Sequence, residues 1–188
     1  MKVQKSQLIP ALALTMVLGA LLAVGGAIAN RETGPEGSGT APPAPPAGPP
    51  DVIRLDGLRG LEFGASEEEL TRQGALLPQT TACGPRLTGL ATVSPVFADD
   101  RLVLLWASPP MRTPEGIEVG TPVDTVHQTY PHVSTLSAPA GSYRFDGLLA
   151  AEGDRGYLFL HDGRIVRKIV AGYAEWARRL FDDGFGTC

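Results

Sequence analysis

The candidates for chemistry in this 188-residue sequence are its three histidines, its two cysteines and two glutamates that occupy repeated positions. Glu62 and Glu118 stand at the same place in two similar segments. Paired carboxylates can work as a general acid and a general base, as in many hydrolases. Duplication of the segment explains this pair more simply, so we assign no catalytic residue.

The three histidines do not form a recognisable ligand set. Pro131 separates His127 from His132 and breaks the helical spacing that two ligands on one face would need, and His161 precedes a hairpin turn. The sequence also lacks a Gly-x-Ser-x-Gly nucleophile motif and a glycine-rich phosphate loop. We therefore expect no metal, no cofactor and no enzymatic activity.

A short glycine-bounded segment that occurs twice organises the chain. Residues 60–64 read Gly-Leu-Glu-Phe-Gly, and residues 116–120 read Gly-Ile-Glu-Val-Gly. A polar residue and a helix-like segment follow each copy. The repetition predicts two short units, each a helix with an antiparallel sheet, at about 57–110 and 113–171.

The helix of the first unit has clear local signals. Ser66 and Glu69 form a capping-box pattern, Leu70 is the first apolar position, and Gly74 ends the helix. The consecutive glutamates 67–69 point in different directions around a helix and cannot converge on one ion. They predict a solvated first turn.

The helix of the second unit repeats this start. Thr121 is the expected cap, Pro122 the first helical residue, and Asp124 the acid of the capping box. Val126 lies in its apolar stripe, and Pro131 stops it.

Two strands are expected in the first unit. The segment 91–97 contains Pro95, which suits only an edge or bulged strand. Residues 101–107 give the strongest strand prediction. The side chains expected on one face are Leu102, Leu104 and Trp106, and those on the other are Val103 and Leu105. Because both faces are apolar, this strand should be central or covered.

Three strands are expected in the second unit, at 143–150, 156–161 and 164–171. Asp162 and Gly163 favour a type I′ hairpin turn between the last two. From about 172 to 183 the apolar period becomes helical, which predicts a C-terminal amphipathic helix with Trp176 as a core anchor. The pattern as a whole predicts an α+β fold.

The N-terminal part indicates export. Residues 1–29 have a basic start, an uncharged apolar run over 8–29, and small residues before a cleavage point after Ala29. The run is also long enough to span a bilayer, so a cleaved signal peptide and a retained anchor that contacts the membrane both stay open. Residues 30–50 are rich in proline and glycine and predict a disordered linker. A globular part at 51–188 would then lie outside the cytoplasm, secreted or anchored.

The only two cysteines are Cys83 and Cys188. In an oxidising compartment an even count favours one disulfide, which would tie the last residue to the first unit. A redox-active thiol or a metal ligand is the alternative, but neither cysteine has a suitable neighbour in sequence. The formal net charge of −4 carries no basic cluster, so nucleic acid is not an expected partner.

The glycine-bounded turn, the capped short helix and the strands that follow, all used twice, resemble the tandem repeat of beta-lactamase inhibitor protein and its single-repeat relatives, the SmpA/BamE envelope lipoproteins. Residues 111–117 with Tyr130 and Pro131 also resemble secreted or lipid-anchored proteins of high-GC Gram-positive bacteria. The resemblance covers roughly 57–188 and implies the fold. This chain lacks one cysteine pair within each repeat, and no inhibitory loop can be carried over.

Two functions follow as expectations. The first is an extracytoplasmic binding or inhibitory module of the cell envelope, whose partner is an envelope or extracellular protein or a wall component. The candidate partner face consists of Tyr143, Phe145, Tyr157, Phe159 and His161, with ordinary core as the alternative for all five. The second is an extracytoplasmic hydrolase, which would bring His127, His161 and a carboxylate together in one concave pocket.

Overall fold

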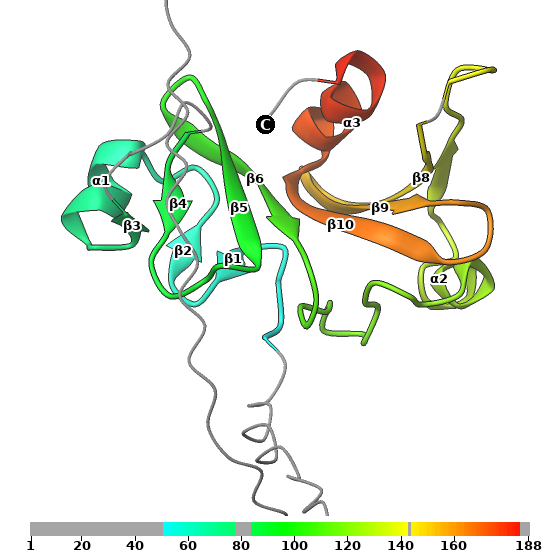
Figure 1. Ribbon diagram of the computed structural model, residues 1–188, viewed down its shortest axis with the longest axis horizontal. Helices are drawn as coiled ribbons and strands as arrows, with labels where there is room; N and C mark the ends of the chain where they lie inside the picture. The colour runs from blue at the N-terminus through cyan, green and yellow to red at the C-terminus, as the bar shows by residue number, and fades with distance from the viewer. Residues whose placement is uncertain (1–50, 78–83, 143, 185–188) are drawn as a thin grey trace, which may run out of the picture. The chain divides into compact units, whose positions relative to one another are not determined.

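One six-stranded antiparallel sheet forms the centre of the fold, in the order β5-β6-β10-β9-β8-β7 (Figure 1). The computed structural model describes residues 51–77, 84–142 and 144–184. The strands of this sheet are β5 Val93–Ala98, β6 Arg101–Ala107, β7 Ser134–Leu136, β8 Asp146–Glu152, β9 Arg155–His161 and β10 Val166–Tyr173. Two short ladders pair β1 Gly57–Leu58 with β2 Leu61–Glu62 and β3 Leu76–Leu77 with β4 Arg86–Leu87.

Three helices complete this part of the chain. They are α1 Glu67–Arg72, α2 Val123–Thr129 and α3 Ala174–Asp183. The mixture of antiparallel strands and short helices, including one at the C-terminal end, confirms the predicted α+β class. The two units do not build separate sheets, however. The first contributes β5 and β6 to the common sheet, and the second contributes the other four strands.

The glycines that bound the two segments have closely similar backbone angles. Gly60 and Gly64 have φ of 83° and 94°, and Gly116 and Gly120 have φ of 89° and 100°. These positive values lie where residues with a Cβ are strained, which explains glycine at all four positions. The repeat in the sequence is therefore also a repeat in structure.

Each glycine-bounded segment docks on a strand of the sheet through the same pair of backbone hydrogen bonds. In the first unit Leu102 accepts from Gly64 N–H at 2.8 Å and donates to the Ala65 carbonyl at 2.9 Å. In the second unit Val166 accepts from Gly120 N–H and donates to the Thr121 carbonyl, both at 2.8 Å. Leu102 on β6 and Val166 on β10 are thus equivalent.

A β-bulge follows each of these equivalent residues. On β6, Leu102 pairs with Phe97 and Leu104 pairs with Val96, which leaves Val103 as the extra residue. On β10, Val166 pairs with His161, and the register resumes at Lys168 opposite Leu160. Arg167 is therefore the extra residue on β10.

The bulge changes one sequence prediction. Leu102 faces the same core as Leu105 and Ala107, while Val103 and Leu104 both face the other core. The predicted grouping of Leu102 with Leu104 is wrong, because a bulge inserts one residue and shifts the alternation of side chains. The prediction that both faces of this strand are covered is confirmed.

The sheet has a core on each face. On one face, the larger cluster of buried side chains packs under the β1–β2 segment and helices α1 and α2, with Leu70 and Val126 fully buried. On the other face α3 lies across β8, β9, β10 and β6 (Figure 1). Leu180 and Phe181 of α3 are buried there, whereas the predicted anchor Trp176 is only half-buried.

Local signals are confirmed at several ends of elements. The Ser66 side chain accepts from Glu69 N–H at 3.1 Å, and Gly74 follows α1 with φ 71°. The strand with Pro95 is an edge strand, as expected. Gly184 ends α3 in the left-handed conformation.

Two local predictions are wrong. Thr121 does not cap α2; its hydroxyl accepts from Glu118 N–H at 3.0 Å and so closes the glycine-bounded segment instead. The turn after His161 is not type I′, since Gly163 is positive in φ and Asp162 is not. The Asp162 carboxylate instead accepts from the N–H groups of Arg164 and Ile165, both at 3.0 Å.

Several predictions fall outside the described residues. These are the leader at 1–29, the linker at 30–50, Tyr143, Cys83 and Cys188. In the part of the chain that is described, no helix has the length and apolar character needed to cross a membrane.

Candidate functional site

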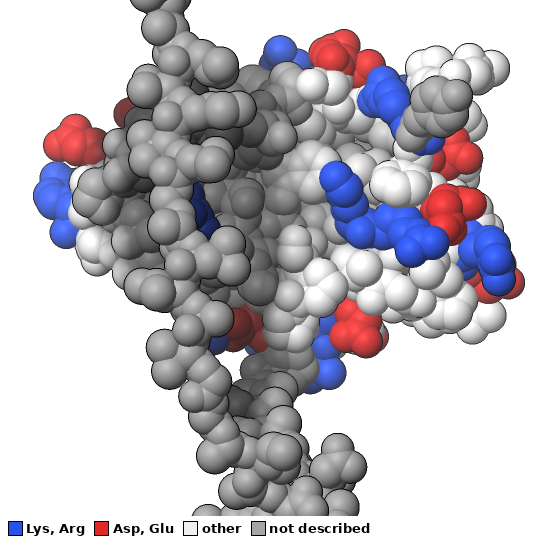
Figure 2. Space-filling view, in the orientation of Figure 1, with Lys and Arg blue, Asp and Glu red and all other residues white. Residues whose placement is uncertain are grey.

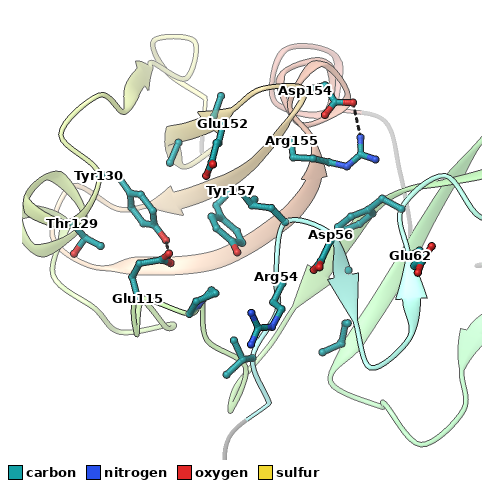
Figure 3. A pocket seen from close by; sticks show the side chains of 18 of the residues that line it. Arg54, Asp56, Glu62, Glu115, Thr129, Tyr130, Glu152, Asp154, Arg155 and Tyr157 are labelled. Atoms are coloured by element: carbon teal, nitrogen blue, oxygen red, sulfur yellow. Dashed lines mark hydrogen bonds and ion pairs between the residues drawn. The ribbon is translucent and has the colours of Figure 1, made fainter.

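An open cleft of about 1210 Å³ lies between segments of the two units (Figure 3). The first unit supplies residues 52 and 54–63, which include the β1–β2 hairpin. The second supplies residues 114–115, 129–133 and the β8–β9 hairpin around Glu152 and Arg155. Segments that are far apart in sequence thus form its opposite walls.

The hairpin wall depends on one glycine. Gly57 has φ 145°, and a Cβ placed there would lie 1.8 Å from the carbonyl oxygen of Leu61. A side chain is excluded at that position, since the contact is with backbone. Leu58 and Leu61 bury their side chains in the core, which leaves Glu62 exposed at the cleft.

Aromatic rings support the second wall. Tyr130, at the end of α2, stacks on Phe159 at 5.5 Å between ring centroids, and Tyr157 lies 6.1 Å from Tyr130. The Tyr157 hydroxyl donates to the Ile53 carbonyl at 3.0 Å and so ties β9 to the first unit. Burial, followed by the charge of Glu115, raises the pKa of Tyr157, so this hydroxyl stays protonated at neutral pH.

Glu115 is held at the rim of the cleft by a short hydrogen bond. The hydroxyl of Tyr130 lies 2.5 Å from the Glu115 carboxylate and 3.1 Å from the hydroxyl of Thr113 (Figure 3). Burial by itself would raise the pKa of Glu115, but the hydrogen bonds from Tyr130, from its own backbone and from Thr113 together lower it. The pKa of Tyr130 is raised by burial and by Glu115. Glu115 is therefore an anion and Tyr130 its donor.

Arg155 lines the cleft and lies between two aromatic rings. Its guanidinium lies 3.4 Å from the centroid of the Tyr173 ring and 5.9 Å from that of Phe63, and it pairs with Asp154 at 2.9 Å (Figure 3). The cation–π contacts join a ring of the first unit to the ring of the last residue of β10. Arg155 therefore has a structural partner on each side.

Four other charged side chains line the cleft without a hydrogen bond or ion pair from their side chains to another described residue. They are Arg54, Asp56, Glu62 and Glu152, and all four are exposed. Three of the four are acidic, and Glu115 adds a further carboxylate. The described walls thus offer a partner more free negative than positive charge.

A second charged surface lies over β10, where Lys and Arg side chains gather (Figure 2). Its charges are more fully engaged within the chain. Arg167 pairs with Asp162 at 2.6 Å, and the ammonium of Lys168 lies 5.3 Å from the Trp106 ring. The cleft is therefore the stronger candidate for binding.

Most of the described candidates for the partner face lie in the core. Tyr157, Phe159 and His161 are 2%, 0% and 7% exposed, and Phe145 is half-buried. The three residues on β9, Tyr157, Phe159 and His161, point inward because side chains alternate along a strand, and this alternation places them on the face of the sheet that packs under α2. Phe159 and His161 do not line the cleft, whereas the nearly buried Tyr157 does.

The residues proposed for a hydrolase are not assembled in the cleft. Neither His127 nor His161 lines it, and Glu62 lines it without Glu118. Among the described residues no group of three histidine, cysteine or acidic side chains is placed to hold a metal ion. His132 does line the cleft, at the end of α2.

Few of the residues that form the cleft could be recognised from sequence patterns. Arg54, Asp56, Glu115 and Glu152 stand in separate turns and carry no motif. Two lining residues had been singled out, Glu62 as one of the repeated glutamates and Tyr157 as a candidate for the partner face. Comparisons of the chain with family models, with curated proteins and with solved structures find no match. The assignment of a function therefore rests on the geometry of this chain.

Proposed function

We propose that this protein is an extracytoplasmic binding module, and that the cleft between its two units receives a segment of a partner protein. The observation that carries the proposal is the combination of an open cleft of about 1210 Å³ with four charged lining side chains that lack a side-chain partner among the described residues. Charged groups left unpaired at a concave surface favour a complementary ligand.

The charge of the lining indicates what the partner presents. Arg59 and Arg155 also line the cleft, but they pair with Asp51 and Asp154. The lining charges without a side-chain partner among the described residues are the carboxylates of Asp56, Glu62 and Glu152 and the guanidinium of Arg54. A segment with lysine or arginine side chains would pair with these carboxylates. The lining also includes the aromatic residues Phe63, Tyr130 and Tyr157, so apolar parts of the segment would have rings to pack against.

Site-specific photocrosslinking in cells tests the cleft. A photoreactive amino acid replaces Glu152, which lines the cleft, and in a matched control it replaces Glu175, which is exposed on α3 outside the cleft. We expect a protein to be captured from position 152 alone. The capture should be lost when Arg54→Glu and Glu62→Arg are added, since they invert charges on the opposite wall. Equal capture from both positions, or no capture from position 152, would contradict the proposal.

The proposed location rests on the leader and linker and is tested separately. Protease added to intact cells should digest the domain if it is outside the cytoplasmic membrane, and N-terminal sequencing shows whether cleavage occurs after Ala29. A domain that becomes accessible only after lysis would contradict the extracytoplasmic location and leave the chemistry of the cleft untouched.

A further inference from the structure

His161 is a buried polar residue, whereas the equivalent residue of the first unit, Phe97, is apolar. His161 pairs with Val166 at the start of the β10 bulge, as Phe97 pairs with Leu102 at the start of the β6 bulge. Phe97 and His161 face the same core. The fold therefore does not require a histidine at this position. The free-energy cost of burying a polar imidazole here needs another explanation.

The cost is visible in the hydrogen bonding of the imidazole. His161 is 7% exposed, and its Nε2 is buried with no hydrogen-bond partner among the described residues. Its Nδ1 accepts from the N–H of Gly163 at 3.1 Å. Accepting at Nδ1 fixes the neutral tautomer with the proton on Nε2. A proton added to Nδ1 would face the Gly163 N–H, and this hydrogen bond would be lost.

The turn that His161 holds is the anchor of α2. The carbonyl of Arg164 accepts from the N–H of Val123 at 3.0 Å, at the first residue of the helix. Next to the turn, Val166 exchanges two backbone hydrogen bonds with Gly120 and Thr121. Loosening this turn would therefore loosen the start of α2 and the second glycine-bounded segment.

We propose that His161 is a proton-operated latch, whose neutral imidazole holds the β9–β10 turn closed and whose protonation releases the turn together with the start of α2. The helix ends beside Tyr130, so release would also disturb the wall of the cleft that carries Glu115. The latch follows from contacts within the chain and holds whether or not the cleft receives a partner.

The charged groups around His161 determine the direction of the effect. The net effect of the surroundings is to lower the pKa of His161, and burial is the largest cause. His127 on α2 also lowers this pKa, whereas the acidic groups of Asp146 on β8 and Asp162 in the turn raise it. A histidine whose pKa is lowered by folding contributes full stability above its unfolded pKa of about 6.5 and progressively less as the pH falls below it. Asp162 stays ionised in this window, because hydrogen bonds from Ile165 and Arg164 lower its pKa.

Amide hydrogen exchange of the full chain between about pH 7 and about pH 5 tests the latch. For the wild-type chain we expect protection factors at 120–126 and 163–166 to fall, by up to about tenfold per pH unit for one proton, while the β6–β10 ladder keeps its protection. His161→Gln, which retains an acceptor but does not titrate, should abolish this dependence. His161→Phe, the residue of the other unit, should do the same, and His127→Gln should not.

The outcome that overturns the latch is equally specific. It is wrong if His161→Gln or His161→Phe retains the wild-type pH dependence, or if protection falls uniformly over the whole sheet. It is also wrong if His127→Gln removes the dependence, since the exposed histidine of α2 would then be the group that titrates. Loss of partner capture at the cleft has no bearing on these outcomes.

Discussion

Val103 and Arg167 occupy the same position in the two units, each as the extra residue of a β-bulge. The strands that carry them lie side by side, and their pairing is symmetric. Ala107 pairs with Ile169 and Leu105 pairs with Ala171, so the local twofold passes through the pair of Trp106 and Val170. The duplicated sequence has therefore folded into one sheet with two related halves rather than into two sheets.

The two halves of the sheet differ in the environment of the bulged side chain. Val103 is buried, whereas Arg167 is exposed and pairs with Asp162. The β-bulge that the two halves share thus carries an apolar residue in one half and a charged residue in the other. Bulges bend a strand and increase its twist whatever the side chain, so the geometry can persist while the side chain changes.

Replacement of Gly172 by alanine should destabilise the centre of the sheet. Gly172 has φ 144°, and a Cβ there would lie 2.2 Å from the carbonyl oxygen of the bulged Val103. Gly141→Ala is the matched control, because φ is 76° and nothing lies within 4 Å of its Cβ. We expect a loss of about 1–2 kcal/mol for the control and more than about 3 kcal/mol for Gly172→Ala in urea unfolding. Equal losses in the free energy of unfolding would show that the close approach of β6 and β10 does not exclude a side chain at position 172.

Removal of the Tyr130 hydroxyl should raise the pKa of Glu115. A carboxylate whose pKa is lowered by folding contributes stability above its unfolded pKa of about 4.3, and that contribution is lost as the pH falls through the folded value. Tyr130→Phe removes the hydrogen-bond donor, so the pKa of Glu115 in the folded protein should rise. The pH at which the stability contribution of Glu115 is lost should rise with it. The measurement is a titration of the Glu115 carboxyl carbon by NMR. In the control, Tyr157→Phe, the hydroxyl lost is one that donates to Ile53, and the Glu115 titration should not move.

A disulfide between Cys83 and Cys188 remains a prediction from the sequence. A crosslink that closes a loop of about 100 residues is worth about 4–5 kcal/mol in the chain-entropy model. Reductant should therefore lower the unfolding temperature of the wild-type chain and leave that of the double variant Cys83→Ser, Cys188→Ser unchanged. Free thiols in protein secreted under oxidising conditions, detected by alkylation and mass spectrometry, would refute the pairing.

Features that depend on a few neighbouring residues were predictable from the sequence. The cap at Ser66, the edge strand with Pro95 and the left-handed end of α3 at Gly184 all follow from interactions within a few positions. The duplicated glycines predicted a repeated backbone for the same reason. Their positive φ is a property of the residue type and needs no distant contact.

The candidate site could not be predicted in this way. Arg54, Glu115 and Glu152 become neighbours of one cleft only because β10 joins β6 and brings the two units together. His161 was predicted to lie on a partner face. The alternation along its strand shows which residues share a face with it, but not whether that face is covered by other elements. Thr121 was predicted as a helix cap, but its hydroxyl accepts from the N–H of Glu118, in the preceding turn, instead.

The sequence by itself determined the α+β class, the repeated turns, and the ends of α1 and α3, because local conformational preferences and short-range hydrogen bonds decide them. Only the tertiary structure decided that the two units share one sheet, where its bulges shift the faces of β6, and which charges border the cleft. Those properties depend on strand register and burial, which arise from contacts between residues far apart along the chain.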